Sequence, residues 1–195
     1  MMTSIADETA LWSRARSGDG RAFASVFDLH RDRAFRHALR LVASAHDAED
    51  VVAAAFFELW RKRDRVSVVD GSVLPWLLVT TTNLARNTGR GLRRHRAAID
   101  RLPRSADLVD PAETAEERIA REHLLTAVRA LGEQDAALVV LTALEDLTVA
   151  DAGAALGLSP GAARVRLHRA RKKLRDRLGP ADPLLDTPLP EGAAR

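Results

Sequence analysis

Apolar residues recur at three- and four-residue intervals along most of this chain, and charged residues fill the positions between them. This spacing gathers the apolar side chains on one face of an α-helix, whereas a half-buried strand would alternate apolar and polar positions. Together with helix start and stop signals, the pattern predicts helices over residues 21–42, 47–63, 75–96, 111–131 and 133–145, after a short first helix that ends near residue 17. We therefore expect an all-α fold.

Interruptions of this pattern divide the chain into two small helical bundles joined by a flexible linker. The first bundle is expected over residues 7–96 and the second over residues 110–178. Residues 97–109 contain a proline, a serine and several charges with weak periodicity, which is typical of a linker. Residues 179–195 are rich in proline and are expected to be a disordered tail.

The clearest local signals lie between residues 148 and 178, at the end of the second bundle. Thr148 and Asp151 have the spacing of a capping box, and Gly157 stands where a left-handed residue ends a helix. Ser159 then caps a second helix whose first position is Pro160, where a missing N–H does no harm. A short helix, a turn containing glycine and a longer basic helix form a helix-turn-helix, which places its second helix in the major groove of DNA.

The second helix of this motif has an apolar face and a basic face. At about 100° per residue, one stripe contains Ala163, Leu167, Ala170, Leu174 and Leu178. From residue 161 to residue 178 there are eight Arg or Lys and one Asp, a net charge of +7, whereas the whole chain carries +3. Such a concentration of positive charge on one element indicates phosphate binding. The alternative is a solvated amphipathic helix that only covers a core, but surfaces of that kind usually mix charges of both signs.

Composition narrows the class of protein further. The 195 residues are 46% hydrophobic, enough for packed cores, and contain no cysteine, which excludes disulfides and thiolate metal sites. No N-terminal signal and no apolar run long enough to span a membrane occur, so we expect a cytoplasmic protein with no membrane insertion. His30, His37 and His46 have carboxylates nearby but lack the HExxH spacing of a metalloenzyme, and no GxxxxGK phosphate loop occurs. We therefore expect no enzyme activity, no metal and no cofactor.

Four stretches of the chain, in this order, resemble the bacterial sigma factors of the extracytoplasmic-function group, the small two-domain members of the sigma-70 family. They are GDGRAFASVFDLH at residues 18–30, DAEDVVAAAFFELWRKRD at 47–64, PWLLVTTTNLARNTGRGLRRHR at 75–96 and LTVADAGAALGLSPGAARVRLHRARKKL from residue 147. The resemblance covers nearly all of residues 11–178. It implies a sigma factor that binds core RNA polymerase, directs it to specific promoters and helps melt the −10 region. It also implies an anti-sigma factor as a regulatory partner.

The resemblance implies that the helix over residues 47–63 docks on a coiled coil of the largest polymerase subunit. The residues assigned to this contact are Asp47, Glu49, Asp50 and Val51. Val52, Phe56 and Trp60 add an apolar face, much of which must also serve the core of the bundle. For the acidic cluster, the alternative is simple complementation of the helix dipole.

The helix over residues 75–96 is implied to handle the −10 element. Trp76 and Asn83 match characteristic positions; Asn83 would read a base edge or hold a phosphate, and the alternative is that it merely caps a turn. Arginines suited to contacts with the DNA backbone follow in the same helix: Arg86, Arg90, Arg93, Arg94 and Arg96. The loop over residues 65–74 is implied to capture a base flipped out of the non-template strand, so that stacking and polar contacts offset the cost of unstacking.

The helix that begins at Pro160 is implied to read the −35 element in the major groove. The residues assigned to base or phosphate contacts are Arg164, Val165, Arg166, His168, Arg169, Arg171 and Lys172. An arginine that meets guanine end-on contributes about 1–3 kcal/mol of discrimination. A phosphate contact is favoured for Arg166, because it lies nearer the apolar stripe.

Three departures from the family pattern bear on these roles. Ala53 stands where the family usually has Gln, and Asp151-Ala152-Gly153 stands where it usually has Glu-Ile-Ala. Gly161-Ala162-Ala163, with Val165 after it, replaces the frequent Gly-Thr-Val and the Ser that follows, which removes two hydroxyl donors from the −35 reader. Gly153 is expected to cost its short helix up to about 1 kcal/mol against alanine.

The main alternative is an ordinary operator-binding regulator with the same helix-turn-helix. Its first bundle would bind a ligand or a second subunit, and it would bind duplex DNA without polymerase. The docking stretch and the second basic helix at residues 75–96 argue against this class. An anti-sigma factor is a third class, but it would need no basic reader helix.

Overall fold

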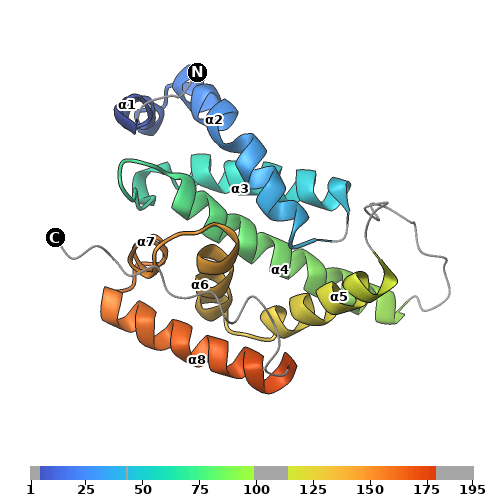
Figure 1. The fold of residues 1–195 in the computed structure, drawn as a ribbon. Helices are drawn as coiled ribbons and strands as arrows, with labels where there is room; N and C mark the ends of the chain where they lie inside the picture. Colours follow the sequence, from blue (N-terminus) through green and yellow to red (C-terminus); the bar gives the residue numbers. More distant parts are fainter. Residues whose placement is uncertain (1–4, 43, 99–113, 179–195) are drawn as a thin grey trace. The chain divides into compact units, whose positions relative to one another are not determined.

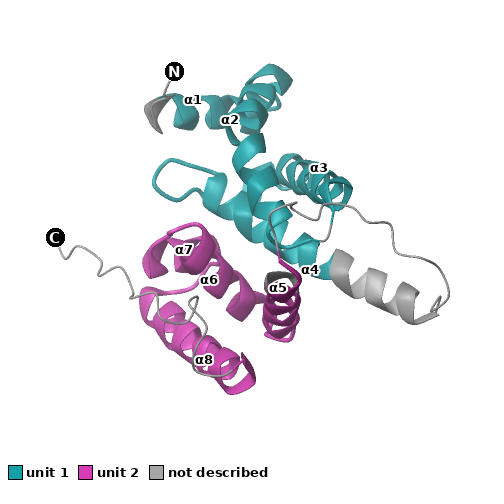
Figure 2. Cartoon of the chain, turned by 45° about the vertical axis from the view of Figure 1, so that its right-hand side comes forward, with its two compact units in different colours: residues 1–99 teal, residues 100–195 magenta. Residues whose placement is uncertain are grey.

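The computed structural model describes residues 5–42, 44–98 and 114–178, with side chains placed at all of these except 5–6, 88–98 and 117–118. These residues form α-helices and one 3-10 helix, with no β-strand among them (Figure 1). The chain divides into two compact units, Met1–Ile99 and Asp100–Arg195 (Figure 2). The predicted all-α fold with two helical bundles is confirmed for the described part of the chain.

The first unit packs around its third and fourth α-helices. Its elements are α1 (Ile5–Arg16), α2 (Gly20–Leu39), α3 (Ala45–Arg61), the 3-10 helix η1 (Arg63–Arg65) and α4 (Leu74–Ala98). Helices α2, α3 and α4 contact one another, and α1 lies against α2 (Figure 1). Fully buried side chains at their centre include Val26, Leu59, Leu77 and Leu78. Helix α4 still includes residues 97–98, where the linker was predicted to begin.

Local capping fixes the helix boundaries of the first unit. Gly18 has φ +93°, a conformation that glycine adopts without strain, and it ends the turn after α1. The carboxylate of Asp19 then accepts hydrogen bonds from two N–H groups of the first turn of α2. Ser44 caps α3 in the same way, because its hydroxyl accepts a hydrogen bond of 3.0 Å from the N–H of Asp47. The predicted break at residues 17–20 is therefore confirmed.

The second unit contains the predicted helix-turn-helix. Its elements are α5 (Ala115–Arg129), α6 (Glu133–Leu144), α7 (Val149–Ala155) and α8 (Pro160–Leu178). Helices α6, α7 and α8 lie side by side, and α5 packs against α8 (Figure 1). Fully buried side chains here include Leu138, Leu141, Leu167 and Leu174. The cap predicted at Asp110 and Glu113, most of the predicted linker and the predicted tail lie outside the described residues.

Candidate functional site

The helix-turn-helix forms through the local contacts that the sequence predicts. The N–H of Asp151 donates to the hydroxyl of Thr148 at 3.1 Å, and that hydroxyl donates to the Asp151 carboxylate at 2.6 Å. Gly157 has φ +68° and ends the turn after α7. The hydroxyl of Ser159 accepts a hydrogen bond of 3.3 Å from the N–H of Ala162 in the first turn of α8. The capping predictions for this motif are confirmed.

Gly153 of α7 and Ala163 of α8 both depart from the family pattern, and they lie against each other where the two helices pack. A Cβ atom added at Gly153 would lie 2.8 Å from the Cβ of Ala163, closer than real Cβ contacts allow. Both residues are completely buried or nearly so. Gly153 is therefore more than a weak helix former, because its lack of a side chain allows the two helices of the motif to approach.

Helix α8 presents one buried face and one exposed basic face. Ala163, Leu167, Ala170 and Leu174 are at most 2% exposed and pack into the unit, as the sequence pattern predicts. The exposed face contains five of the residues assigned to the −35 element: Arg164, Val165, His168, Arg169 and Lys172. Val165 is 50% exposed, which is unusual for a valine and leaves its methyl groups free for an apolar contact. A thymine methyl group is a partner of that kind in the major groove.

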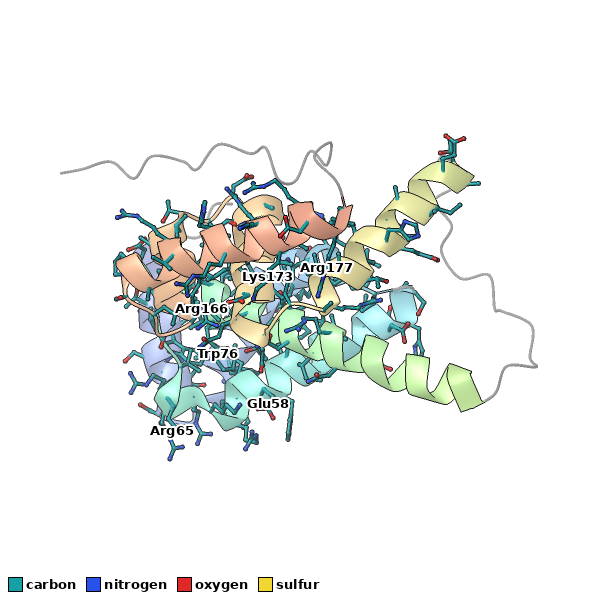
Figure 3. The ribbon with its side chains drawn as sticks, turned by 90° about the horizontal axis from the view of Figure 1, so that it is seen from below. Glu58, Arg65, Trp76, Arg166, Lys173 and Arg177 are labelled. Carbon is teal, nitrogen blue, oxygen red and sulfur yellow. The ribbon has the colours of Figure 1, made fainter. Side chains whose placement is uncertain are left out.

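Arg166 and Arg171 differ from the other assigned residues of α8. The guanidinium of Arg166 donates to the carboxylate of Asp135 at 3.0 Å, and Lys173 lies 3.6 Å from the same carboxylate (Figure 3 labels both basic residues). Asp135 is 9% exposed and lies in the first turn of α6. Arg171 is half-buried; burial lowers its pKa, and the charge of Arg175 lowers it further. Both arginines therefore lie toward the body of the domain.

Helix α3 places the assigned acidic residues on its accessible side. Glu49 and Asp50 are exposed, and Asp47 is half-buried in the first turn. Val51 differs from the prediction: it is 3% exposed, because it faces the core of the bundle, and it is not available to a partner. At the other end of α3, hydrogen bonds from Arg61 and Lys62 lower the pKa of Glu58 to about 2 (Figure 3).

An apolar pocket of about 450 Å³ opens between α2 and α3. It is lined by Gly20, Phe23, Phe27, Ala53, Phe56, Phe57 and Trp60. Phe23 packs on Trp60 with ring centroids 4.9 Å apart, and the guanidinium of Arg63 stacks on Trp60 at 4.7 Å. Phe57 is 65% exposed, which is exceptional for a phenylalanine.

Sequence reasoning had not identified Phe57 as a functional residue. A signal was present, because Phe57 follows Asp50 by seven residues and Ala53 by four. At helical spacing these residues share one face, and that face is otherwise acidic or small. An aromatic residue on such a face indicates a binding surface.

Helix α4 distributes its assigned residues between the core and the surface. Trp76 and Asn83 are half-buried, and the side-chain oxygen of Asn83 is buried without a hydrogen-bond partner among the described residues. Arg86 differs from the prediction of a backbone contact: it is 4% exposed and lies within the bundle. The side chains of Arg90, Arg93, Arg94 and Arg96 lie outside the described residues.

The loop between η1 and α4 ends in a tight, ordered turn. Val69 and Ser72 exchange two backbone hydrogen bonds of 3.0 Å. The two residues between them, Asp70 and Gly71, have φ of +49° and +78°. Positive φ at both central positions is the geometry of a type I′ turn, which Asp-Gly favours. The loop predicted over residues 65–74 therefore has a defined shape at its tip.

Neither a metal-binding cluster nor a membrane-spanning helix occurs among the described residues. Among the described residues, no three His, Asp or Glu side chains are grouped closely enough to hold a metal ion. None of the helices described here combines the length and the apolar character needed to cross a bilayer.

The fold and these surfaces define a two-domain DNA-binding factor with a helix-turn-helix. Two family models match it: Sigma-70 region 2 over residues 26–100 and Sigma-70, region 4 over residues 121–174. The chain belongs to the sigma-70 family of transcription initiation factors, and within it to the extracytoplasmic-function group. The first unit carries the region 2 match and the second unit carries the region 4 match.

Curated relatives support this membership. The chain is 34% identical over 169 residues to the RNA polymerase sigma factor CarQ of Myxococcus xanthus, covering 85% of this chain and 94% of CarQ. It is 35% identical over 170 residues to the ECF RNA polymerase sigma factor SigE of Mycolicibacterium smegmatis, covering 83% of this chain and 65% of SigE.

Solved structures share the fold. CnrH in complex with the cytosolic domain of CnrY superposes with a TM-score of 0.54 at 24% identity, covering 87% of this chain and 95% of CnrH. The sigma factor RpoE of Bartonella quintana, in complex with the anti-sigma factor NepR, superposes with a TM-score of 0.50 at 21% identity. The match covers 82% of this chain and 98% of RpoE. At these identities the likeness extends to the fold alone.

Proposed function

We propose that this chain docks on core RNA polymerase and opens the −10 element with its first domain, residues 7–96, and reads the −35 element with its second, residues 110–178. Membership of the sigma-70 family supports promoter-specific initiation of transcription by RNA polymerase. The residue roles within each domain are those that the family resemblance implies, revised where the structure buries a side chain.

The observation that carries this function is a pair of chemically opposite faces on separate domains. Helix α3 exposes Glu49, Asp50 and Phe57 around an apolar pocket, whereas α8 exposes a row of cations. An acidic and aromatic face suits a protein partner, because exposed aromatic residues anchor protein interfaces. A cationic helix suits the phosphates and guanines of DNA.

For docking, we assign Asp47, Glu49 and Asp50 to polar contacts and Phe57 to the apolar anchor. Ala53 lines the pocket where the family usually has Gln, so a small apolar side chain stands there in place of a longer polar one. Val51, which is buried, is proposed to support the docking face of α3 from the core and not to contact polymerase. An operator-binding regulator would have no use for an open aromatic pocket beside an acidic cluster.

For the −35 element, we assign base and phosphate contacts to the five exposed residues of α8. They are Arg164, Val165, His168, Arg169 and Lys172. Arg166 and Arg171 are proposed to hold the helix in place. For the −10 element, Trp76, Asn83 and the arginines at positions 90, 93 and 94 are proposed to contact the opened strand, with the loop before α4 receiving the flipped base.

The chain is proposed to act in the cytoplasm, by binding and without a catalytic step of its own. An anti-sigma factor is proposed as its regulator, since CnrH and RpoE are each solved with a bound partner, CnrY and the anti-sigma factor NepR. The aromatic pocket on α2 and α3 is accessible for such a partner in the absence of polymerase.

The decisive experiment is binding of the purified chain to core RNA polymerase without DNA, in competition with the housekeeping sigma factor. Phe57→Asp is expected to weaken binding by about tenfold or more, as for the loss of an interface anchor. Asp50→Lys is expected to act in the same direction. Ile119→Asp is a matched control, because Ile119 is 53% exposed on the other domain.

The outcomes separate the two classes of protein. Competitive binding that depends on Phe57 and not on Ile119 supports the sigma role and the docking face. Tight binding to free duplex DNA, with none to core polymerase, would indicate an operator-binding regulator instead.

A further inference from the structure

Glu8 of α1 is buried at a junction of three segments. It is 6% exposed, and its Oε1 atom accepts three hydrogen bonds. His30 Nε2 of α2 lies 2.8 Å away, the Ser72 hydroxyl donates at 2.9 Å, and the Val73 N–H donates at 2.9 Å. One carboxylate oxygen of α1 therefore joins α2 to the end of the loop that precedes α4.

A second contact from the same helix reaches the same loop. The hydroxyl of Thr9 donates to the carbonyl oxygen of Gly71 at 3.1 Å. Gly71 is a central residue of the type I′ turn, and Ser72 is its last residue. The turn is thus closed by its own backbone pair and tied to α1 through adjacent residues of that helix.

The cost of burying this carboxylate argues for a specific role. Burial alone would raise the pKa of Glu8, but hydrogen bonds from His30, Val73 and Ser72 and the charge of His30 outweigh it, so the pKa is lowered. Buried ion pairs stabilise a fold less than apolar packing of the same volume. Their best-supported use is to select one arrangement of the chain over others, and here the arrangement is that of the loop.

Helix α1 lies outside the family match. The region 2 model begins at residue 26, so Glu8 and Thr9 belong to a segment to which that match gives no role. Their side chains form hydrogen bonds outside α1 to His30 and to residues 71–73.

We propose that Glu8 is a positioning residue for promoter opening: by holding Ser72 and Val73, it keeps the turn of residues 69–72 in the conformation that receives the extruded base. This inference rests on the proposed function of the loop. Glu8 itself does not touch DNA, and its effect passes through the backbone of the turn. The inference predicts a defect in strand opening rather than in polymerase docking.

The test uses holoenzyme assembled from core polymerase and the full chain on a promoter with a single abasic site, moved through the −10 region of the non-template strand. Opening is measured by permanganate reactivity of unpaired thymines. For the unmodified chain, an abasic site at the captured position should reduce opening. On the intact promoter, Glu8→Gln should reduce opening roughly tenfold, because the substitution keeps an acceptor oxygen but turns three charge-assisted hydrogen bonds into weaker neutral ones.

Two further variants and a control keep the test independent of the folding of one mutant. Ser72→Ala and Thr9→Val each remove one tie to the turn and should give smaller losses in the same direction. Arg14→Gln is the control, because Arg14 pairs with Asp19 at 2.6 Å on the exposed side of the same helices and does not contact the loop. It should open the promoter as the unmodified chain does.

The positioning role is supported if the Glu8→Gln defect disappears on the promoter that lacks the captured base, since both proteins then have nothing to receive. An equal defect on intact and abasic promoters would overturn it, because that result describes general loss of structure. Normal opening by Glu8→Gln would also overturn it. If no abasic position affects the unmodified chain, base capture by the loop is itself wrong and the positioning role falls with it.

Discussion

At the residue scale, Gly153 illustrates how packing reverses an expectation from helix propensity. In an isolated helix, alanine would be more stable than glycine by about 1 kcal/mol. In this domain the added methyl group would lie 2.8 Å from the Cβ of Ala163. Overpacking of a close helix contact costs about 1–3 kcal/mol. The steric cost is therefore expected to exceed the gain in propensity.

Gly153→Ala is accordingly expected to lower the free energy of unfolding by about 1 kcal/mol, the middle of the range of about 0–2 kcal/mol that the two effects leave as their net. Thermal or urea unfolding of the full chain measures it. Ala163→Gly added to Gly153→Ala should recover part of the loss, because it removes the clashing methyl group. Gly161→Ala is the matched control, since a Cβ there meets nothing within 4 Å. A Gly153→Ala protein as stable as the control would contradict the packing argument.

At the element scale, α8 divides its cations between an exposed face and contacts within its own domain. Arg166 and Lys173 lie within 3.6 Å of the Asp135 carboxylate, whereas Arg164, Arg169 and Lys172 are exposed and form no ion pair with any described residue. Asp135 is in the first turn of α6, where its charge also suits the helix dipole. The net charge of +7 on α8 therefore overstates what the helix offers to phosphates.

Replacing Asp135 with Asn should release these two cations toward DNA. Each additional phosphate contact steepens the dependence of log affinity on log salt by about 0.9. We expect the slope for holoenzyme binding to a promoter duplex to steepen by about 1–2 in Asp135→Asn. Glu133→Gln removes an equal charge from the exposed start of the same helix and should change the slope less. An unchanged slope in Asp135→Asn would mean that Arg166 and Lys173 face away from DNA even when free.

Contacts between residues close in the sequence could be predicted in these helices, whereas contacts between distant residues could not. The helix-turn-helix could be predicted because each of its signals acts within about four residues: Thr148 on Asp151, and Ser159 on Ala162. The pairing of Arg166 with Asp135 spans 31 residues, and that of Glu8 with Val73 spans 65. No local rule links such partners, because the fold must first bring their helices together.

The remaining differences between the predicted and observed site residues concern whether a side chain is buried or exposed. Val51 and Arg86 follow family positions in the sequence, yet both are at most 4% exposed. Phe57 differs in the opposite sense: phenylalanine is usually buried, yet this side chain is 65% exposed. Residue type predicts burial only on average, since a folded surface always includes apolar atoms.

At the scale of the whole molecule, docking on core polymerase and reading of the −35 element are assigned to different units. A substitution can therefore remove one function and leave the other. The acidic and aromatic face of α3 belongs to the first unit, and the basic face of α8 belongs to the second. A variant that lacks only the reading function should still occupy core polymerase.

Arg169→Ala is therefore expected to act as an inhibitor of the unmodified chain. Added in excess to a transcription reaction with limiting core polymerase, it should reduce promoter-specific transcripts in proportion to its share of the mixture. Adding Phe57→Asp to the same protein should abolish the inhibition, because the double variant no longer competes for core. Inhibition that persists in the double variant would show that the pocket on α2 and α3 is not the docking site.

Protonation of the Glu8 carboxylate is expected to destabilise the first unit at acid pH. Its folded-state pKa lies below the usual 4.5, so it contributes stability that is fully present above about pH 4.5 and lost as the pH falls through the lowered value. Protonation weakens all three hydrogen bonds at once, because they converge on one oxygen atom. Acidification would thus release helix α1 and the turn together, as one event rather than two.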